Sequence, residues 1–388
     1  MRDQQNLTVQ PLLDEIRAQA GTADESRSVA TSVIDGLKDN PIMRFSASEN
    51  LGGLACPMFD IGEELEAVAS ACGSTAWVLW NHLATFHLFA GLLGPEQKVF
   101  LSDIVAKGEW VCFPAGASTG VKATPAGDKF TLAGKAAFGS GARYADWAGV
   151  AFVIEDRTAP QFSMVKLNQA GVKIDPDWRA MSLRASATDT VYYSGVGLAA
   201  NRVVPFHFRY REVFRDPAHA MIDHRYREDW VALSDLWLAM MAVGVLQANL
   251  DEVTQGIKDR VAIGGVKVAE RPTVHVNLGQ AKASIDAARD TAVTALLETD
   301  QRIEQNIIPA EVHYLRQMSA SMAALKLCNE AMGLLLRVMG GNGLREGPSF
   351  ERRYRDFQAM PLHINAHQDR LSEQIGRNLL GLPTENPF

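Results

Sequence analysis

The order of the sequence patterns along the chain is the feature that most limits its fold. Residues 1–107 carry helical patterns rich in alanine and leucine. Residues 108–205 change to short β-branched and aromatic runs separated by glycine, proline, aspartate and lysine, which predicts a small antiparallel sandwich or barrel. Helical periodicity returns from about residue 228 and predicts an up-and-down bundle. We therefore predict an N-terminal helical domain (1–107), a middle β domain (108–205) and a C-terminal helical bundle (206–388) with a leading linker at 206–227.

The composition narrows the partners that such a chain would bind. Its 388 residues suffice for two or three packed domains, and the apolar share of 47% allows a large core. A net charge of -7 without a long basic run argues against a nucleic-acid partner. The four cysteines lie far apart and form no C-x-x-C pair, so we predict no metal site, no disulfide framework and a cytoplasmic location.

Residues 75–94 approach the length of a membrane span. They contain Asn81, His82 and His87, whose transfer into lipid would be costly. The N-terminus is polar and lacks the apolar region of a signal peptide. We therefore predict a buried helix of a large protein, with no membrane partner. The polar residues of that helix then need hydrogen-bonding partners or a pocket.

Four stretches, in this order along the chain, resemble the acyl-CoA dehydrogenase superfamily. They are most similar to its flavin-dependent monooxygenase branch, which includes the two-component (group D) oxygenases acting on hydroxyphenylacetate, a steroid-derived phenol and dibenzothiophene. The resemblance covers the chain from about residue 10 to 385. The stretches are ACGSTAWVLWNH (71–82), GKAAFGSGARYADWAGVAF (134–152), MGGNGL with FERRYRDFQAMPLH (339–344 and 350–363), and QIGRNLLGLP (374–383).

The resemblance implies both a fold and a chemistry. The fold would be mainly α with a central β domain: an N-terminal helical domain, a middle β-sandwich or barrel, and a C-terminal four-helix bundle. Reduced flavin, either FMN or FAD, would come from a separate flavin reductase and react with dioxygen to give a C4a-(hydro)peroxide. This species would hydroxylate a small, aromatic or heterocyclic substrate in a dry cavity. A homotetramer is the usual assembly of the superfamily.

His363 is the residue that the resemblance assigns to the peroxide. In the dehydrogenases a glutamate base commonly follows an Arg-Asp pair by eight residues, inside a Y-E-G-T phrase, whereas here Arg355-Asp356 is followed by Ile364 at that position. The monooxygenases instead resemble this chain in carrying a histidine seven residues after the aspartate. An imidazole can donate to the distal peroxide oxygen or take a phenol proton near pH 7. The alternative is a core histidine with both nitrogens satisfied.

Ser140 follows Phe138-Gly139 and precedes Gly141 in the second of these stretches. The resemblance implies that Ser140 meets flavin N5 and acts in catalysis, and that Phe138, Ser140 and Gly141 contact the cofactor. A small hydroxyl can approach the ring edge, and glycine allows close passage of the backbone. The alternative is an ordinary β-turn serine.

Three residues are predicted to lie around the substrate. His82 matches a region in which a related sulfur oxygenase uses a histidine, so we assign it a catalytic role, with His87 as its rival. Trp77 is expected to line the substrate pocket, because flat aromatic ligands pack well on indole rings. Phe113 is the third expected pocket residue. The alternatives are a buried histidine bonded to a backbone carbonyl and ordinary core aromatic residues.

Arg260, Gly340 and Gly341 are the predicted contacts to the phosphates of the flavin. Arg260 lies in a phrase similar to the R-x-x-F-G of the superfamily, although Ile263 replaces the phenylalanine. A guanidinium suits bidentate contact with phosphate. For the two glycines, the resemblance implies backbone contacts to the diphosphate or to the adenine side of the cofactor. The alternatives are a surface arginine and glycines that only end a helix.

Two other functions stay open at this point. An acyl-CoA dehydrogenase with a relocated base would bind FAD tightly and be reduced by a thioester. A non-catalytic helical assembly protein would take up no flavin. The missing Y-E-G-T phrase argues against the first, and the retained Ser140, Arg260 and His363 argue against the second. No G-x-G-x-x-G motif follows a strand, which agrees with a chain that depends on a separate reductase.

Overall fold

The computed structural model describes the chain except residues 1–5, 116–119, 156–158, 207–209 and 385–388. Residues 207–209 of the predicted linker therefore lie outside the described residues. The first part of the chain is helical, as its alanine- and leucine-rich patterns predict. Its helices are α1 (Leu13–Ser26), α2 (Thr31–Asp39), α3 (Met58–Ala71), α4 (Gly73–Leu93) and α5 (Lys98–Ala106).

The strands of the described residues form one sheet. They are β1 (Val111–Cys112), β2 (Val121–Ala126), β3 (Lys129–Gly139), β4 (Trp147–Ile154), β5 (Pro160–Lys166), β6 (Val172–Asp175), β7 (Asp189–Ala199) and β8 (Val204–Pro205). They lie in the order β6-β7-β3-β2-β4-β5-β8, with β1 beside β4. Most pairings are antiparallel, but β4 pairs in parallel with both β1 and β2. Alternation of apolar residues predicts strands and not these parallel pairings, because it records burial rather than strand direction.

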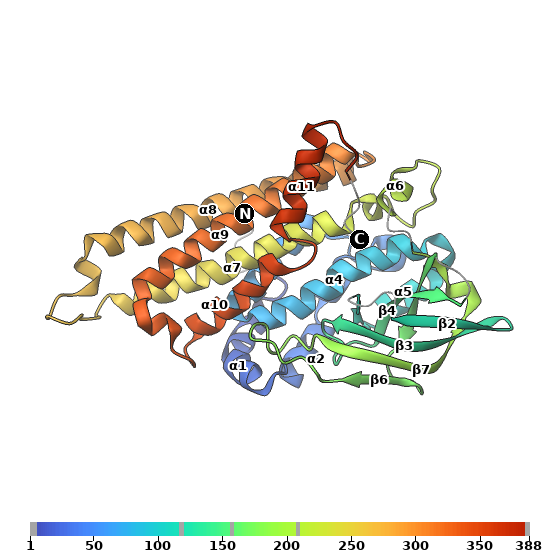
Figure 1. The fold of residues 1–388 in the computed structure, drawn as a ribbon, viewed down its shortest axis with the longest axis horizontal. Helices are drawn as coiled ribbons and strands as arrows, with labels where there is room; N and C mark the ends of the chain where they lie inside the picture. The colour runs from blue at the N-terminus through green and yellow to red at the C-terminus, as the bar shows by residue number, and fades with distance from the viewer. Residues whose placement is uncertain (1–5, 116–119, 156–158, 207–209, 385–388) are drawn as a thin grey trace.

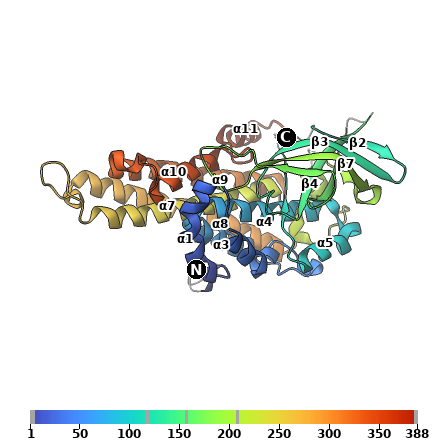
Figure 2. The same cartoon turned by 90° about the horizontal axis from the view of Figure 1, so that it is seen from below.

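The last part of the chain is a helical bundle. Its helices are α6 (Tyr210–Arg215), α7 (Trp230–Ile257), α8 (Pro272–Glu304), α9 (Glu311–Met339), α10 (Ser349–Ala359) and α11 (Gln368–Leu379). Helices α7, α8 and α9 pack side by side, and α3 packs against α7 and α8. Figure 1 and Figure 2 show the bundle and the sheet at opposite ends of the long axis. The predicted fold class, mainly α with a central β domain, is confirmed.

Helix α7 is long and apolar enough to cross a membrane by length and composition. However, 89% of its most apolar window is buried inside the protein. It packs against α3, α8 and α9, as the central helix of a bundle does. We therefore describe α7 as a core helix.

Helix α4 runs between the sheet and the bundle. It packs against α3 and α7 on one side and against β1 on the other. Leu79 and Leu83 belong to the hydrophobic core shared with the bundle, and Phe89 belongs to the core that reaches the sheet. Only Asn81 and Leu92 of this helix are not fully buried. Helix α4 therefore joins the bundle to the sheet, and it also carries residues of the site described below.

Gly244 marks a close approach of α7 to α3. A Cβ atom at this position would lie 2.1 Å from the carbonyl oxygen of Glu66. We expect Gly244→Ala to lower the free energy of unfolding by roughly 1–3 kcal/mol through overpacking, as measured by urea denaturation. Gly256→Ala is the control in the same helix, because a Cβ there meets nothing within 4 Å and alanine favours helix by up to about 1 kcal/mol. Equal stability of the two variants would contradict this packing.

Candidate functional site

The turn at the end of β3 brings Ser140 next to α4. The register of β3 against β7 shifts just before this turn, and Phe138 adopts a left-handed φ of 59°. Gly141 has a φ of 76°, which glycine adopts without the strain of a side chain. A Cβ on Gly141 would lie 3.5 Å from the Cβ of Val78. Gly141 therefore serves both the backbone conformation of the turn and its close packing on α4.

Ser140 belongs to a buried chain of hydrogen bonds. Its Oγ accepts a hydrogen bond from Nε1 of Trp77 at 2.9 Å and lies 3.0 Å from Oγ1 of Thr188. The Thr188 hydroxyl lies 2.7 Å from Oγ of Ser186. The backbone N–H of Gly141 donates to the Ser186 carbonyl at 2.9 Å. These contacts join the turn, α4 and the loop before β7.

His363 lies at the end of the short helix η10 (Met360–Leu362), against two indole rings. Its ring centroid is 5.5 Å from that of Trp77 and 5.0 Å from that of Trp80, in edge-on contact. Trp77 therefore contacts both His363 and Ser140, and it joins these two predicted residues into one site.

The surroundings of His363 favour its neutral form. Burial of the ring, and secondly the positive charge of Arg370, lower the pKa of His363 from 6.5 to about 4. The backbone N–H of Asn365 points at Nδ1 of His363 at 3.4 Å. This long contact favours the tautomer whose proton is on Nε2. At neutral pH, His363 is thus an uncharged imidazole with one N–H to donate.

Both histidines of α4 are bonded to backbone groups. Nδ1 of His82 accepts a hydrogen bond from the Val111 N–H at 3.0 Å, and Nε2 donates to the Met43 carbonyl at 3.0 Å. Nε2 of His87 donates to the Glu228 carbonyl at 3.1 Å. Burial lowers the pKa of His82 to about 4 and that of His87 to about 3. The structure therefore uses both ring nitrogens of His82 to tie α4 to its neighbours and does not turn either toward a substrate.

Phe113 lies in an aromatic cluster near the end of β3. Its ring centroid is 5.6 Å from that of Phe89 and 6.2 Å from that of Trp230. The next residue, Pro114, would lie 3.1 Å from a Cβ placed on Gly139. Phe113 is thus close to the turn that carries the serine, but it is packed within a buried cluster.

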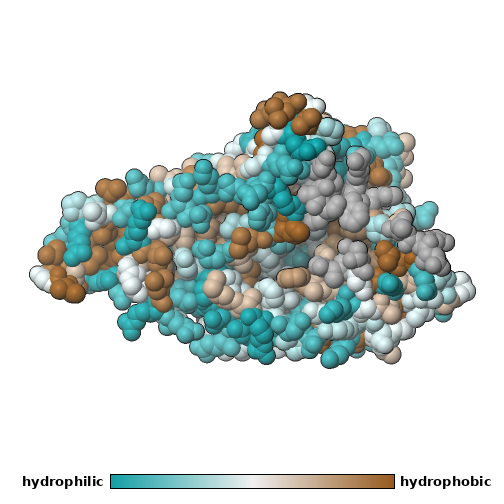
Figure 3. Space-filling model, in the orientation of Figure 1, coloured by the Kyte–Doolittle hydropathy of each residue, from teal (hydrophilic) through white to brown (hydrophobic). Residues whose placement is uncertain are grey.

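Asn81 is one helical turn from Trp77 and so lies on the same side of α4. It is the one polar residue of the helix that is not fully buried, and its Oδ1 has no hydrogen-bond partner within the described residues. Figure 3 shows the surface hollowed between the bundle and the sheet, where α4 runs in Figure 1. An unpartnered amide oxygen on the Trp77 side of α4 is suited to accept a hydrogen bond from a small molecule.

A second group of predicted residues meets at the end of the bundle. Arg260 follows α7, and its Nη1 donates to the Met339 carbonyl at the end of α9, at 3.1 Å. Gly340 and Gly341 come next in the chain, and a Cβ on either would meet nothing within 4 Å. Figure 1 places these helix ends away from the sheet. A single chain therefore does not bring this group to Ser140.

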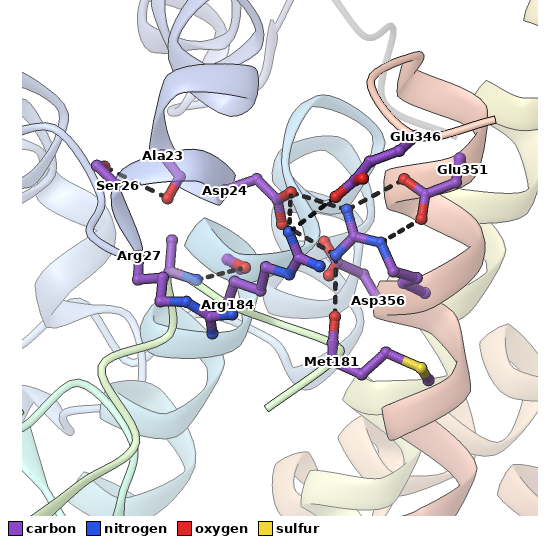
Figure 4. A network of polar contacts seen from close by, with 12 residues as sticks. Ala23, Asp24, Ser26, Arg27, Met181, Arg184, Glu346, Glu351 and Asp356 are labelled. Carbon is purple, nitrogen blue, oxygen red and sulfur yellow. Dashed lines mark hydrogen bonds and ion pairs between the residues drawn. The ribbon is translucent and has the colours of Figure 1, made fainter. Parts of the chain in front are cut away.

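A network of ion pairs fixes α10, which leads to η10, against α1. Arg355 binds both oxygens of Asp24, at 3.2 and 2.7 Å, and donates to the Met181 carbonyl at 2.9 Å. It also pairs with Glu351 one turn earlier, and Arg184 lies 3.5 Å from the same Asp24 carboxylate. Figure 4 shows these groups converging from three parts of the chain. The network holds α1, the loop before β7 and α10 in one arrangement.

Asp356 lies beside this network and accepts a hydrogen bond from the Leu183 backbone N–H at 2.7 Å. Burial raises the pKa of Asp356 from 3.8 to about 6, although the Leu183 hydrogen bond acts in the opposite direction. This folded-state pKa exceeds that of an unfolded aspartate, about 3.9. The group therefore contributes stability that is fully present below about pH 4 and is lost as the pH rises through about 6.

We expect Asp356→Asn to remove this pH dependence, because the amide keeps an oxygen acceptor for Leu183 and cannot ionise. The difference in unfolding free energy between the variant and the wild type should change between about pH 4 and 6 and stay constant above pH 7. Urea denaturation over this range is the measurement. A difference that is the same at every pH would contradict the raised pKa.

Two residues of this site were missed from the sequence, Ser186 and Thr188. They lie in the run RASAT (184–188), which carries no motif that separates their hydroxyls from those of an ordinary loop. Only the crossing of this loop under the β3 turn brings them to Ser140. Within the part of the chain that the structure describes, no three His, Cys, Asp or Glu side chains gather as a metal site would require.

Comparison with known proteins supports the resemblance seen in the sequence. The family model of the acyl-CoA dehydrogenase C-terminal domain matches residues 236–368. The oxygenase subunit HsaA of a flavin-dependent monooxygenase from Rhodococcus jostii (strain RHA1) is 25% identical over 391 residues, which cover 96% of this chain and 97% of that protein. The chain is thus similar to the acyl-CoA dehydrogenase superfamily in its C-terminal part, and to the oxygenase component of a flavin-dependent monooxygenase over nearly its whole length. The oxygenase component of a FADH(2)-dependent resorcinol hydroxylase from Rhizobium sp. (strain MTP-10005) is also 25% identical, over 97% of this chain and 93% of that protein.

A solved structure shares the architecture over nearly the full length of the chain. XiaF from Streptomyces sp., solved with FADH2 and glycerol, superposes with a TM-score of 0.87 at 18% identity, covering 98% of this chain and 96% of that chain. The predicted acyl-CoA-dehydrogenase-like fold is therefore confirmed. The similarity to the flavin-dependent monooxygenase branch is confirmed as well, because both relatives named above are oxygenase components.

Proposed function

We propose that this chain is the oxygenase component of a two-component monooxygenase, which uses reduced flavin and dioxygen to hydroxylate a small aromatic or heterocyclic substrate. The observation that carries the proposal is the meeting of Ser140 and His363 on Trp77. A hydroxyl for the flavin ring edge and a neutral imidazole for activated oxygen are the two donors that this chemistry needs. The oxygenase relatives support it.

The residues of the β3 turn fit the isoalloxazine ring of a flavin. Phe138 is 59% exposed beside Ser140 and offers an aromatic face to a flat ring. The ring of Trp178 packs edge-on against the ring of Phe138, with 6.2 Å between the two ring centroids, and supports it. We assign Phe138, Ser140 and Gly141 to contact with FMN or FAD. Reduced flavin, once bound, supplies the electrons and the atom at which dioxygen is activated.

The phosphate contacts are proposed to come from a second copy of the chain. Arg260, Gly340 and Gly341 lie at the end of the bundle away from Ser140, so one chain does not offer both groups to one flavin. Ile263, three residues after Arg260, is fully exposed, as suits a contact between copies. We propose a homotetramer in the cytoplasm, supplied with reduced flavin by a separate reductase.

The roles of the remaining residues follow from their protonation and contacts. His363 has a pKa of about 4, which makes it a weak base, so we assign it as the Nε2–H donor to oxygen at the flavin rather than as the acceptor of a substrate proton. The rings of Trp77 and Trp80 offer a wall for an aromatic substrate, and Oδ1 of Asn81 offers an acceptor for its donor group. His82 supports α4 through its backbone contacts.

A stopped-flow experiment tests the proposal. The protein is mixed anaerobically with reduced FMN or FADH2 and then with dioxygen. We expect a transient absorbing species distinct from both reduced and oxidised flavin, and hydroxylation of phenol or indole probes. Bleaching of bound FAD by an acyl-CoA, without such a species, would identify a dehydrogenase instead. A protein that takes up neither flavin in either redox state would support the assembly role.

A further inference from the structure

Asp235 on α7 is a buried acid that the site described above does not use. Its side chain is fully buried, and neither of its carboxyl oxygens has a hydrogen-bond partner within the described residues. An ionised carboxylate in this position would have neither water nor a donor around it, which is strongly unfavourable. The surroundings of Asp235 therefore favour the neutral carboxylic acid, which carries a proton.

The charged groups around Asp235 leave this conclusion in place. Burial, and secondly the negative charge of Asp229 at the start of the same helix, raise the pKa of Asp235 well above 3.8. Arg370 on α11 acts in the opposite direction, and its Nη1 donates to the Ile364 carbonyl. Tyr314 on α9 is kept neutral, because burial raises its pKa. The charge of Arg370 therefore does not outweigh the burial of the acid.

The turn of α7 that carries Asp235 lies beside His363. The carbonyl of the preceding residue, Ser234, accepts a hydrogen bond from Nε1 of Trp80 at 2.9 Å, and the ring of Trp80 packs on His363. The Ser234 hydroxyl lies 3.5 Å from Nδ2 of Asn365, whose backbone N–H points at Nδ1 of His363. Oδ1 of Asn365 is buried and has no partner among the described groups. Asn365 thus lies between Nδ1 of His363 and the turn with Asp235.

The proposed reaction consumes one proton when the reduced flavin is bound as its anion. The anion, dioxygen, an aromatic C–H bond and a proton give oxidised flavin, the C–OH product and water. The two electrons of the flavin and two from the C–H bond reduce both oxygen atoms, of which one leaves as water. His363 is neutral at neutral pH. It can therefore release its Nε2 proton completely only if Nδ1 takes up another.

We propose that Asp235 holds the proton that this reaction consumes and passes it to Nδ1 of His363, through water bound at the oxygens of Asp235 and Asn365. The Nε2 proton of His363 moves to the oxygen that leaves as water. When the product has left, a solvent proton taken up at Nε2 sends the Nδ1 proton back to Asp235. A buried water needs two or more polar partners, which these oxygens offer.

Asp235 acts in this scheme through His363, as a positioning residue. The inference rests on the proposed function, which supplies the oxygen that takes up the proton. Its two parts are tested separately, the protonation of Asp235 without flavin and the delivery of the proton during turnover.

Infrared spectroscopy of the flavin-free protein at about pH 8 measures the protonation of Asp235. We expect the difference between wild type and Asp235→Asn to contain the C=O stretching band of a protonated carboxylic acid, shifted in D2O. Asp300 and Asp356, whose pKa values are about 6, are ionised at this pH and cancel in the difference. Asp251→Asn, at an exposed position of α7, should remove no such band. The band of a carboxylate in place of the acid band would overturn the inference.

Single-turnover hydroxylation of phenol or indole probes measures the delivery. Asp235→Asn should slow product formation by roughly 10- to 100-fold, and the loss should grow from pH 6 to pH 8, because solvent protons become scarcer. In the His363→Ala background Asp235→Asn should add no further loss, because both residues act on one path. A merely structural effect of the substitution would add in both backgrounds. Asp235→Ser also removes the acid and serves if Asp235→Asn fails to fold.

Two kinetic outcomes would overturn the inference while the oxygenase function stands. They are an unchanged rate in Asp235→Asn, and an equal loss with and without His363. A wild-type protein that binds neither FMN nor FAD, or that forms no product from either probe, would overturn the proposed function itself.

Discussion

Replacing His363 with alanine is expected to lower the rate of substrate hydroxylation by roughly 100-fold, the usual worth of a positioned proton donor. The oxidation of reduced flavin should continue, with hydrogen peroxide released in place of product. The reason is that the Nε2–H of His363 is the donor that we assign to activated oxygen. The imidazole ring is held in place by its contacts with the rings of Trp77 and Trp80. Product formed and peroxide released per flavin oxidised are the two quantities to measure.

The controls for this variant separate hydrogen bonding from packing. His363→Gln keeps a neutral N–H donor and should recover part of the product yield. His275→Ala removes an exposed histidine on α8 and should leave the yield unchanged. Because the pKa of His363 is about 4, its contribution should be constant between pH 6 and 8. A product yield that is unaffected by His363→Ala would remove this residue from its assigned role.

Replacing Arg355 with methionine is expected to lower the free energy of unfolding by about 3–5 kcal/mol, the usual cost of breaking a buried ion pair. Arg355 is 8% exposed at its side chain, and its partners Asp24 and Glu351 are each 12% exposed. Among the described residues, the variant would leave Asp24 paired with Arg184 alone, at the longer distance of 3.5 Å. The variant would also release α10, which leads to His363, from its contact with α1. The product yield should therefore fall together with the free energy of unfolding.

Two comparisons make this prediction specific. Arg316→Met breaks an ion pair to Glu298 whose side chains are 41% and 40% exposed, and it should cost less than about 1 kcal/mol. Adding Asp24→Asn to Arg355→Met should restore part of the stability, because no uncompensated charge then remains on Asp24. Urea denaturation gives all of these values. If Arg355→Met and Arg316→Met cost the same, the network in Figure 4 does not hold α10 as described.

The fold class could be predicted because helices and strands impose different periods on the sequence. Long segments with a period near 3.6 residues lie on both sides of short alternating runs. Few known folds have their helices and strands in this order. The neighbours of β4 could not be predicted in the same way. Its parallel pairings with β1 and β2 depend on how distant segments cross.

The candidate site could be predicted only in part. The resemblance named His363 and Ser140, and the structure places both against Trp77. The hydrogen-bond partners of a side chain could not be predicted, because they come from segments far away in the sequence. His82 illustrates this, since its ring nitrogens contact Val111 and Met43, which nothing in the sequence around it indicates.

Helix α4 has a consequence for how new specificities can arise in this enzyme. The same helix fills the cores of two parts of the fold and carries two of the rings that contact His363. Mutations that enlarge or reshape its tryptophans would therefore put solubility and yield at risk before they improve a new reaction. Directed evolution should begin at Asn81, which is less buried than the tryptophans and whose Oδ1 has no hydrogen-bond partner to lose among the described residues.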